Sequence, residues 1–249
     1  MTTAHADAKS FWDASFQEQI RQGAYNTAPV EALVRTVAYY LRGRAGSRPR
    51  AQLHFLEMGC GAGANLVWLA RQGLRVSGID VSPTALALAR EQLAQAGCAQ
   101  RVGELREAPA GQVPFADASF DGIVEACVFQ HLPRPERLAA FGEIKRLLKP
   151  GGVFVGYLLD VGHTVFEQQQ AQQLPDDPGT LDLREGRSPL YLTNLGLCHF
   201  FRREELRELL DGFAVVDPGL ATYELPREEA RRRGYDAYRQ SMWTVYAIR

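Results

Sequence analysis

The sequence predicts a single α/β domain, built on a mostly parallel sheet with helices on both faces. Two observations carry this prediction. Short apolar runs of strand length alternate with segments of helical periodicity between residues 53 and 159. The first strand–helix connection is rich in glycine, as in sheets that bind a nucleoside cofactor at their strand ends. A chain of 249 residues is long enough for one such domain with a sizeable core.

The expected elements follow this alternation in order. Pro29 and the apolar residues that follow it at helical spacing indicate a helix ending near Arg42, before an exposed connection over residues 42–49. Strands are expected at Leu53–Met58, Leu74–Asp80, Arg101–Glu107, Phe120–Ala126 and Val153–Leu159. Helices are expected at Asn65–Gln72, from Ser82 to Gly97, and at Pro135–Leu148. Ser82 suits the N-cap of its helix because Pro83 follows at the first helical position.

The alternation breaks after residue 159. Residues 160–199 are expected to be an insertion, in which the glutamine-rich stretch Glu167–Gln173 forms a solvated helix. A helix at Arg203–Leu210 and strands at Phe213–Asp217 and Trp243–Ile248 complete the domain. The run Arg231–Arg233, preceded by two glutamates, indicates a solvated helix face.

The charge balance and the cysteines exclude several classes of function. Lys and Arg total 28 against 29 Asp and Glu, so no basic field is available to bind a nucleic acid backbone. The four cysteines include no close pair, so neither a metal site nor a disulfide framework is expected. The N-terminus lacks the apolar core of a signal peptide and no apolar run could span a bilayer. We therefore expect a cytoplasmic protein with no membrane partner.

The glycine-rich loop, residues 57–63, is the main candidate for chemistry. It follows a strand and opens a helix, where glycines let the backbone turn sharply and approach a ligand. Asp80 ends the next strand, where a carboxylate can accept both hydroxyls of a ribose. This is a nucleoside-cofactor pattern, and Gly59, Gly61 and Ala64 also match the relaxed dinucleotide pattern.

Two features favour S-adenosylmethionine over a dinucleotide. Glu57, two positions before the first glycine, can help to hold the cofactor's ammonium group directly or through water. The same charge would oppose the pyrophosphate of a dinucleotide. The loop also begins more than fifty residues into the chain, whereas dinucleotide domains commonly start almost at once.

Five segments in order match one family. They are Leu56–Gly63, Gly78–Ser82, Val113–Asp121, Leu147–Gly152 and Phe200–Leu206, the last followed by Gly212–Phe213. Together they resemble the class I S-adenosylmethionine-dependent methyltransferases, and in particular their broad small-molecule group. The resemblance implies a Rossmann-like sheet of seven strands, mostly parallel, with an antiparallel last strand that suits the run at Trp243–Ile248.

The resemblance also implies where the cofactor lies. Asp80 would bind the ribose with Val81 beside it, while Glu107 and Ala108 would lie at the adenine amino group. Glu125 and Ala126 would face the methionine part. With the loop and an N-terminal tyrosine, the cofactor-binding set is Tyr25, Glu57, Gly59, Cys60, Gly61, Gly63, Asp80, Val81, Glu107, Ala108, Glu125 and Ala126.

Two segments are expected to cover the site in this single domain of residues 1–249. Residues 1–50 would form a helical lid, in which Trp12 and Tyr25 are either lid contacts or core aromatics; Tyr25 could touch the methionine carboxylate or the substrate. Residues 160–199 would form a small inserted cap over the substrate. Its candidate polar contacts, each with a structural hydrogen bond as the alternative, are His163, Tyr191, Asn194 and His199.

Methyl transfer from a sulfonium is an in-line displacement, so the protein mainly aligns the reacting atoms and excludes water. A general base is needed only if the acceptor arrives protonated. His131, just past the fourth strand, is the candidate base, since an ordinary histidine pKa of about 6.5 suits proton transfer near neutrality. A structural or cofactor-lining role is its alternative. No metal is expected.

The predicted function is therefore methyl transfer from S-adenosylmethionine to an oxygen or nitrogen of a small metabolite or natural product, leaving S-adenosylhomocysteine. The expected partner is a small-molecule methyl acceptor, and the protein is expected to be a monomer or homodimer. Two alternatives keep the fold: a non-catalytic regulatory protein that binds the same cofactor, and an NAD-type oxidoreductase.

Overall fold

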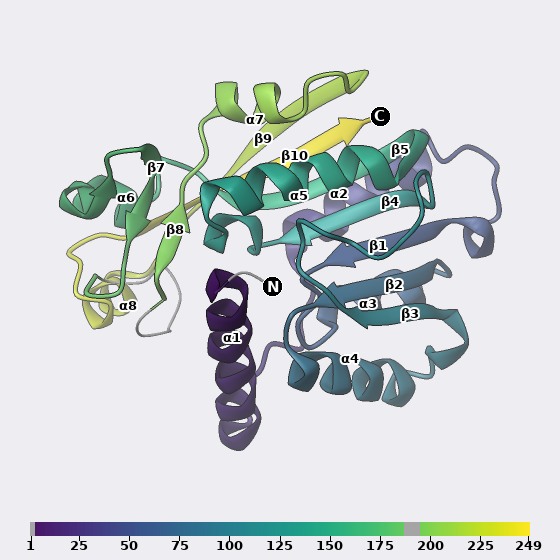
Figure 1. The fold of residues 1–249 in the computed structure, drawn as a ribbon, viewed down its shortest axis with the longest axis horizontal. Helices are drawn as coiled ribbons and strands as arrows, with labels where there is room; N and C mark the ends of the chain where they lie inside the picture. Colours follow the sequence, from purple (N-terminus) through teal and green to yellow (C-terminus); the bar gives the residue numbers. More distant parts are fainter. Residues whose placement is uncertain (1–2, 187–194) are drawn as a thin grey trace.

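Seven strands form one twisted sheet in the order β3-β2-β1-β4-β5-β10-β9, as Figure 1 shows for a computed structural model that describes residues 3–186 and 195–249. The strands are β1 (His54–Met58), β2 (Arg75–Asp80), β3 (Val102–Glu107), β4 (Phe120–Ala126), β5 (Leu148–Leu159), β9 (Val215–Glu224) and β10 (Arg239–Ile248). The pairs among β1 to β5 are parallel, and β10 runs antiparallel to both of its neighbours. The predicted sheet, with its antiparallel last strand, is confirmed.

The sheet has helices on both faces, as predicted. One face is covered by α2 (Glu31–Arg42), α3 (Ala64–Arg71) and α4 (Pro83–Gln95), and the other by α5 (Arg134–Leu147) and α7 (Arg203–Leu209). Successive strand residues point to opposite faces, so Phe55 packs with the first group of helices and Leu56 with the second. The predicted cap of α4 is present, since the Ser82 hydroxyl accepts from the Ala85 N–H at 3.0 Å.

The most polar of the predicted strands, β3, owes its composition to its position. It lies at the edge of the sheet and pairs only with β2. Only Leu105 of its six residues is fully buried. An edge strand has one neighbour instead of two, so polar side chains along it remain solvated.

The inserted segment is built differently from the expectation. It contains α6 (Thr164–Gln168) and a separate three-stranded sheet of β6 (Gln173–Leu174), β7 (Asp177–Asp182) and β8 (Leu197–His199). The predicted helix over Glu167–Gln173 is present only in part: α6 ends at Gln168, a short 3-10 helix covers Gln170–Gln172, and Gln173 begins β6. What holds α6 is its buried first turn and the cap from His163, whose Nδ1 accepts from the Val165 N–H at 3.1 Å.

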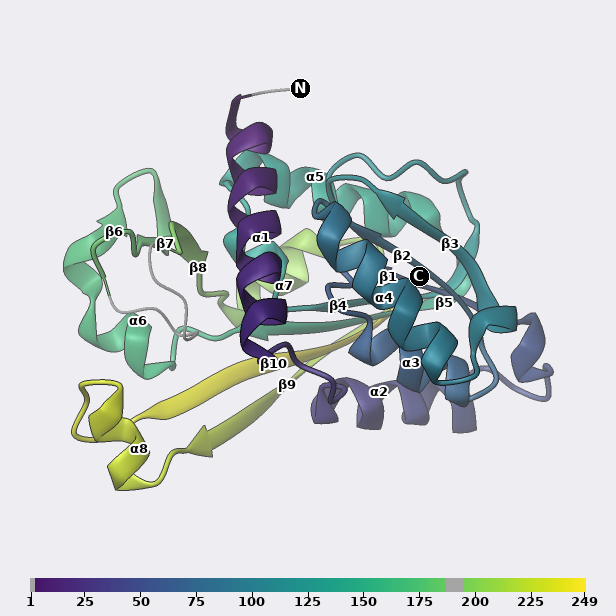
Figure 2. The same cartoon turned by 90° about the horizontal axis from the view of Figure 1, so that it is seen from below.

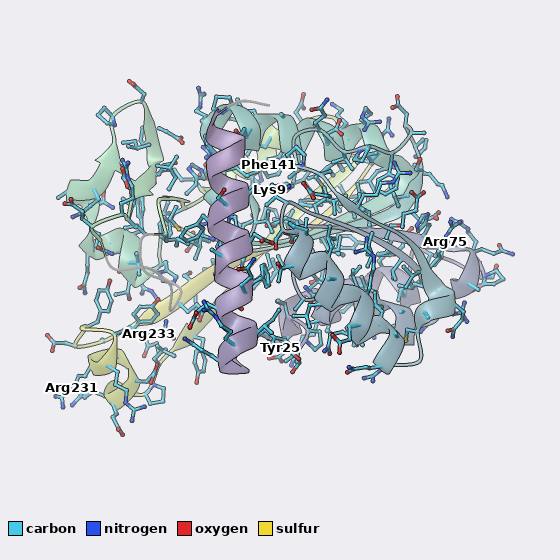
Figure 3. All side chains as sticks on the ribbon, turned by 60° about the horizontal axis from the view of Figure 1, so that its bottom comes forward. Lys9, Tyr25, Arg75, Phe141, Arg231 and Arg233 are labelled. Atoms are coloured by element: carbon cyan, nitrogen blue, oxygen red, sulfur yellow. The ribbon has the colours of Figure 1, made fainter. Side chains whose placement is uncertain are left out.

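The N-terminal helix α1 (Thr3–Gln22) lies outside the two layers of helices. Figures 1 and 2 both show it between α4 and the inserted segment, beside the carboxyl ends of the central strands. At the other end of the chain, β9 and β10 pair over all ten residues of each strand and so run further than predicted. They are joined through α8 (Arg227–Arg232). Arg231 is exposed as predicted (Figure 3), whereas the Arg233 guanidinium lies 4.9 Å from the centre of the Tyr238 ring.

Within residues 3–186 and 195–249, none of the helices combines the length and the apolar character that crossing a membrane requires.

The first testable prediction concerns Asp121, which joins three strands at the end of the sheet opposite α1. Its carboxylate is buried and accepts from Arg48 Nη1 (2.7 Å), the His54 N–H (3.0 Å) and Lys149 Nζ (2.9 Å). Asp121→Ala leaves the strand N–H without an acceptor, so we expect a loss of about 2 kcal/mol in the free energy of unfolding, measured by urea denaturation. The isosteric Asp121→Asn should lose less. A loss below about 0.5 kcal/mol for the alanine variant would contradict this role.

Candidate functional site

The glycine-rich loop connects β1 to α3 and makes a tight turn over the end of β2. The Gly59 and Cys60 N–H groups both donate to the Ile79 carbonyl, at 2.8 and 2.9 Å. Gly59, Gly61 and Gly63 have φ values of +72°, +50° and +85°. A Cβ on Gly59 would lie 2.3 Å from Val128 Cγ2, so a side chain is excluded there by both conformation and space. The loop therefore presents bare backbone at the carboxyl edge of the sheet.

Asp80 joins this loop to the start of α4. Its Oδ2 accepts from the Gly61 N–H at 2.8 Å, and its Oδ1 accepts from the Ser82 N–H at 2.9 Å. Burial raises the pKa of Asp80, although these backbone hydrogen bonds work in the opposite direction. The side chain is 8% exposed, so it is held rigidly at the strand end and retains access to the site.

Two further carboxylates are buried at the ends of β1 and β4. Glu57 Oε1 accepts from Asn65 Nδ2 at 2.7 Å, and Glu125 Oε1 accepts from the Val128 and Phe129 N–H groups at 2.6 and 3.1 Å. The second oxygen of each, Oε2, is buried with no hydrogen-bond partner among the described residues. Burial raises the pKa of Glu57 to about 8 and that of Glu125 to about 7.

Buried polar atoms without partners are rare and costly, so each of these two oxygens marks a place where a donor or a cation would fit. The first oxygen, Oε1, has a different structural role in each residue. Glu125 uses its first oxygen to hold the short helix η3 (Phe129–His131), whereas Glu57 is oriented by a side chain of α3.

The remaining predicted residues at the strand ends contribute mainly backbone. Cys60 turns its thiol into the core, where a Cβ on Gly78 would lie 2.8 Å from Sγ, and burial raises the pKa of this thiol. The Ala108 N–H donates to the Asp80 carbonyl at 3.1 Å. Val81 follows Asp80 directly, and Ala126 ends β4 beside Glu125; both are partly buried. The structure thus brings these four positions to one edge of the sheet.

Helix α1 lies across this edge and makes contacts that the sequence did not predict. Asp13 Oδ1 accepts from the Ser82 hydroxyl at 2.7 Å and from the Thr84 N–H at 3.0 Å, which ties α1 to the start of α4. The ring of Phe16 lies 3.2 Å from the position of a Cβ on Gly61. Lys9 pairs with Glu107, the residue expected at the adenine amino group. No sequence pattern near Asp13 predicts that its side chain binds residues so far along the chain.

Tyr25 lies away from the other predicted residues. Its hydroxyl is 3.4 Å from Gln92 Nε2, close to the C-terminal end of α4, and Figure 3 shows it beyond the end of α1 beside that helix. In this conformation Tyr25 does not join the group at the strand ends. The expectation that it borders the ligand is therefore not met here, because the chain leaves α1 along the outer side of α4.

His131, the candidate base, occupies the junction of three parts of the molecule. Its ring centre lies 5.4 Å from that of Trp12 on α1, its Nδ1 is 3.4 Å from the Leu197 carbonyl of β8, and its Nε2 is 3.4 Å from Gln130 Nε2. Because the amide nitrogen of Gln130 can only donate, Nε2 of the ring is the acceptor and Nδ1 carries the proton. Burial lowers the pKa of His131 to about 4, so the ring is a much weaker base than the sequence suggested.

The two polar candidates of the inserted segment that the structure describes both make structural hydrogen bonds. His163 caps α6, its Nε2 lies 3.5 Å from the Tyr238 hydroxyl, and burial lowers its pKa to about 3. His199 lies between Thr180 and Glu205. Tyr191 and Asn194 lie outside the described residues. Within the described part of the chain, no group of His, Cys, Asp and Glu side chains is arranged to hold a metal ion.

Comparison with known proteins agrees with this geometry. Residues 56–156 match a family model described as a methyltransferase domain. A methyltransferase of Streptomyces halstedii is 38% identical over 120 residues, which are 45% of this chain and 42% of that protein. The malonyl-[acyl-carrier protein] O-methyltransferase of Serratia marcescens is 35% identical over 144 residues, 56% of this chain and 50% of that protein. The chain spans half or less of the length of the curated relatives it matches.

Solved structures share the whole architecture. A SAM-dependent methyltransferase from Methanosarcina mazei is 25% identical with a TM-score of 0.61, over 79% of this chain and 92% of that one. The Burkholderia thailandensis 1,6-didemethyltoxoflavin-N1-methyltransferase, solved with S-adenosylhomocysteine, superposes with a TM-score of 0.62 at 20% identity, over 100% of this chain and 91% of that one.

The fold and the loop define a nucleoside-cofactor protein of the α/β type. The ordered sequence match narrows this: residues 56–156 match the methyltransferase-domain family, and the chain resembles S-adenosylmethionine-dependent methyltransferases in sequence and fold. Two solved structures of this fold contain the cofactor or its product, the Burkholderia thailandensis enzyme S-adenosylhomocysteine and a Synechocystis magnesium protoporphyrin IX methyltransferase S-adenosylmethionine.

The site generates a prediction about protons. With a pKa of about 8, the carboxyl group of Glu57 is mostly protonated at pH 7, and a cation placed beside it favours the ionised form. We therefore expect binding of S-adenosylmethionine at pH 7 to release up to about one proton, and progressively fewer as the pH rises above 8. Calorimetric titrations in buffers of different ionisation enthalpy measure this number directly.

Glu57→Gln should abolish the release, whereas Glu125→Gln, which changes the other buried carboxyl group, should keep most of it. A binding enthalpy that does not depend on the buffer in the unaltered protein would show that Glu57 does not face the ammonium group.

Proposed function

We propose that this protein transfers a methyl group from S-adenosylmethionine to an oxygen or nitrogen of a small molecule. The observation that carries the proposal is the convergence of the bare glycine loop, Asp80 and the unpartnered Glu57 Oε2 at one edge of the sheet, beneath α1. When bound, the cofactor supplies an activated methyl group on a sulfonium. The same constellation suits a dinucleotide less well, because a pyrophosphate at the loop would keep Glu57 protonated and would leave its buried carboxyl group without a cationic partner.

Each residue has a role that follows from its surroundings. Glu57 Oε2 would accept from the cofactor's ammonium group, and Asp80 would accept from the ribose hydroxyls while it keeps its two backbone donors. Glu107 would face the adenine amino group and exchange its contact with Lys9 as α1 moves. Helix α1 would act as a lid that keeps water from the sulfonium, fastened by Asp13 at the start of α4.

His131 would orient the acceptor. Its Nε2 is the acceptor nitrogen of a neutral ring, and it would receive a hydrogen bond from the O–H or N–H group that is methylated in place of the 3.4 Å contact with Gln130 Nε2. A pKa of about 4 makes the ring a weak base in the free protein. The acceptor proton becomes far more acidic as the new bond to carbon forms, so the proton can leave late, with His131 placed to receive it.

The relatives support a small acceptor and both kinds of atom. Two curated relatives are named as O-methyltransferases and one as a phosphatidylethanolamine N-methyltransferase. The Burkholderia thailandensis structure contains 1,6-didemethyltoxoflavin, a small molecule methylated at N1. The inserted segment, packed beside His131 through β8, would form the cap over such an acceptor.

The proposal is tested by following the methyl group. The protein is incubated with S-adenosylmethionine labelled in the methyl group and a metabolite extract freed of macromolecules by ultrafiltration. Label should appear in a small product in proportion to enzyme and time. Cofactor binding without any transfer across such extracts would favour a non-catalytic binding protein instead.

Asp80→Ala should weaken cofactor binding. The substitution removes the acceptor for the ribose hydroxyls and releases the Gly61 and Ser82 N–H groups, so we expect a loss of about 1–3 kcal/mol, or roughly 5- to 150-fold in Kd. Titration calorimetry measures the change, with circular dichroism as the check that the variant is folded. A folded variant with unchanged affinity would remove Asp80 from the cofactor site.

His131→Ala should slow turnover and leave the cofactor affinity nearly unchanged, because the ring faces the acceptor side. A loss of about 10²-fold in kcat is expected for a group that orients the acceptor and receives its proton. The assay uses the acceptor found in the labelling experiment. The reverse result, weak cofactor binding with normal turnover at saturation, would make His131 a cofactor-binding residue.

A further inference from the structure

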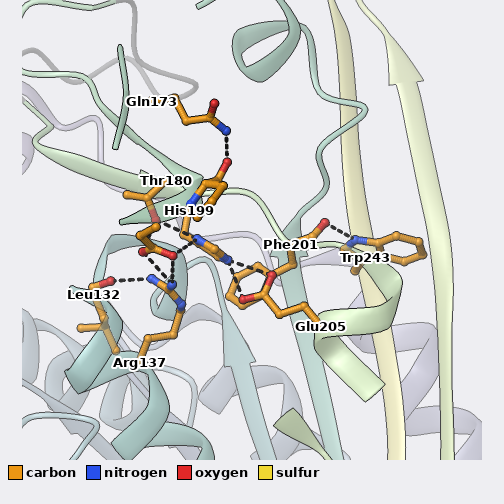
Figure 4. Close-up of polar contacts among 10 residues, drawn as sticks. Leu132, Arg137, Gln173, Thr180, His199, Phe201, Glu205 and Trp243 are labelled. Atoms are coloured by element: carbon orange, nitrogen blue, oxygen red, sulfur yellow. Dashed lines mark hydrogen bonds and ion pairs between the residues drawn. The ribbon is translucent and has the colours of Figure 1, made fainter. Parts of the chain in front are cut away.

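A buried polar network fastens the inserted segment to the main domain (Figure 4). Arg137 of α5 is 2% exposed and donates through Nη2 to both oxygens of Asp177 in β7, at 2.9 and 2.8 Å. The Thr180 hydroxyl lies 2.5 Å from Asp177 Oδ2 and 2.8 Å from His199 Nδ1, and His199 Nε2 lies 2.9 Å from Glu205 Oε1 of α7. The network therefore joins β7 and β8 to two helices of the main domain.

The Thr180, His199 and Glu205 side chains are arranged like a nucleophile, a base and its orienting acid, but this arrangement cannot act on a substrate. Thr180 is 0% exposed, so no ligand can reach its hydroxyl. Its single proton is directed to Asp177, which can only accept because the pKa of Asp177, although raised by burial, is lowered overall by hydrogen bonds from Thr180 and Arg137. The role of the network is mechanical.

Arg137 makes a further hydrogen bond, which reaches the candidate acceptor site. Its Nη1 donates to the Leu132 carbonyl at 3.0 Å, and Leu132 is the residue that follows His131. The same guanidinium thus holds the inserted segment with one nitrogen and the end of η3 with the other. Only a planar fork of donors can bind two partners in this way at fixed distances.

A second link closes the ring of contacts. β7 pairs with β8, with Asp182 opposite Leu197, and the Leu197 carbonyl lies 3.4 Å from His131 Nδ1. His131 is therefore joined to the inserted segment twice: through its own ring to β8, and through Leu132 and Arg137 to β7. The Leu197 carbonyl holds the proton on Nδ1 and Gln130 donates to Nε2, so the tautomer depends on the position of this carbonyl together with Gln130.

We propose that Arg137 and Asp177 are positioning residues that couple the inserted segment to His131 and so set the tautomer with which His131 meets the acceptor. The proposal deepens the proposed function and rests on it for the role of His131. The link also works in the other direction. An acceptor that moves the inserted segment shifts Leu197, and with it the ring that orients the acceptor for transfer.

The test removes the link without leaving a buried charge. In the double variant Arg137→Met/Asp177→Asn both charges are lost together, which avoids the large penalty of a single unpaired buried ion. Arg137→Lys is the second variant, since it keeps the charge but loses the fork. Glu167→Gln is the matched control, because its exposed pair with Arg239 joins the inserted segment to β10 and makes no contact with η3 among the described residues.

Two readouts are used, and neither requires the acceptor. The ring nitrogen signals of His131, assigned with His131→Gln, report the tautomer in ¹⁵N-labelled protein, and calorimetry with S-adenosylhomocysteine reports the cofactor site. We expect protonated Nδ1 in the unaltered protein and in Glu167→Gln. Mixed tautomers are expected in the double variant and in Arg137→Lys, with cofactor affinity within about twofold, since neither residue contacts the residues assigned to that site.

Unchanged His131 signals in a folded double variant would overturn the proposal. If the double variant does not fold, Arg137→Lys decides by the same criterion. Failure of the unaltered protein to bind S-adenosylhomocysteine would instead refute the proposed function, while the ring signals would still show whether the link to His131 exists.

Discussion

The burial of carboxylates at the carboxyl edge of the sheet is the constraint on which the rest of the site depends. Three adjacent strands each carry a buried one at or next to their last residue, Asp80 on β2, Glu57 on β1 and Glu125 on β4, and the edge strand β3 ends on the exposed Glu107. A carboxylate without donors is unstable in such surroundings. Each therefore has its own donors. Glu107 pairs with Lys9, and Asp80 accepts from backbone N–H groups of the loop and of the start of α4. Glu57 accepts from Asn65, and Glu125 accepts from the backbone of residues 128 and 129. Only at Glu57 and Glu125 does one oxygen lack a partner within the described residues, and a cationic cofactor is the chemistry that suits the first.

Two segments outside the sheet meet at this edge, and His131 is where they meet. Helix α1 arrives from one side through Trp12, and β8 arrives from the other through the Leu197 carbonyl. The ring is neutral because its surroundings are mostly apolar, which lowers its pKa to about 4. A neutral ring with one fixed acceptor nitrogen suits the orientation of an O–H or N–H group better than it suits strong general-base catalysis. The lid and the cap can thus both influence methyl transfer without contributing a reacting group.

The sequence predicted the sheet and its flanking helices because both follow from local periodicity. β1, β2, β4 and β5 are buried apolar runs, and the pair Ser82–Pro83 predicts where α4 begins. The glycine-rich turn after β1 was equally predictable, since glycines between a strand and a helix, with a carboxylate at the end of the next strand, leave a clear pattern. The features that the sequence did not predict depend on contacts between residues that are far apart in the chain. The glutamine-rich stretch ends its helix before Gln173 because Gln173 pairs with Leu181 of β7. The Asp13–Ser82 and Arg137–Asp177 contacts join residues 69 and 40 positions apart. The pKa of His131 likewise depends on burial that no local pattern encodes.

We expect this edge of the sheet to bind S-adenosylmethionine and no dinucleotide. The most direct measurement is a calorimetric titration of the purified protein with S-adenosylhomocysteine and, separately, with NAD. The account predicts saturable binding of S-adenosylhomocysteine at one site per chain, unaffected by prior addition of NAD. Binding of NAD that S-adenosylhomocysteine competes away, or saturable binding of NAD alone, would contradict it.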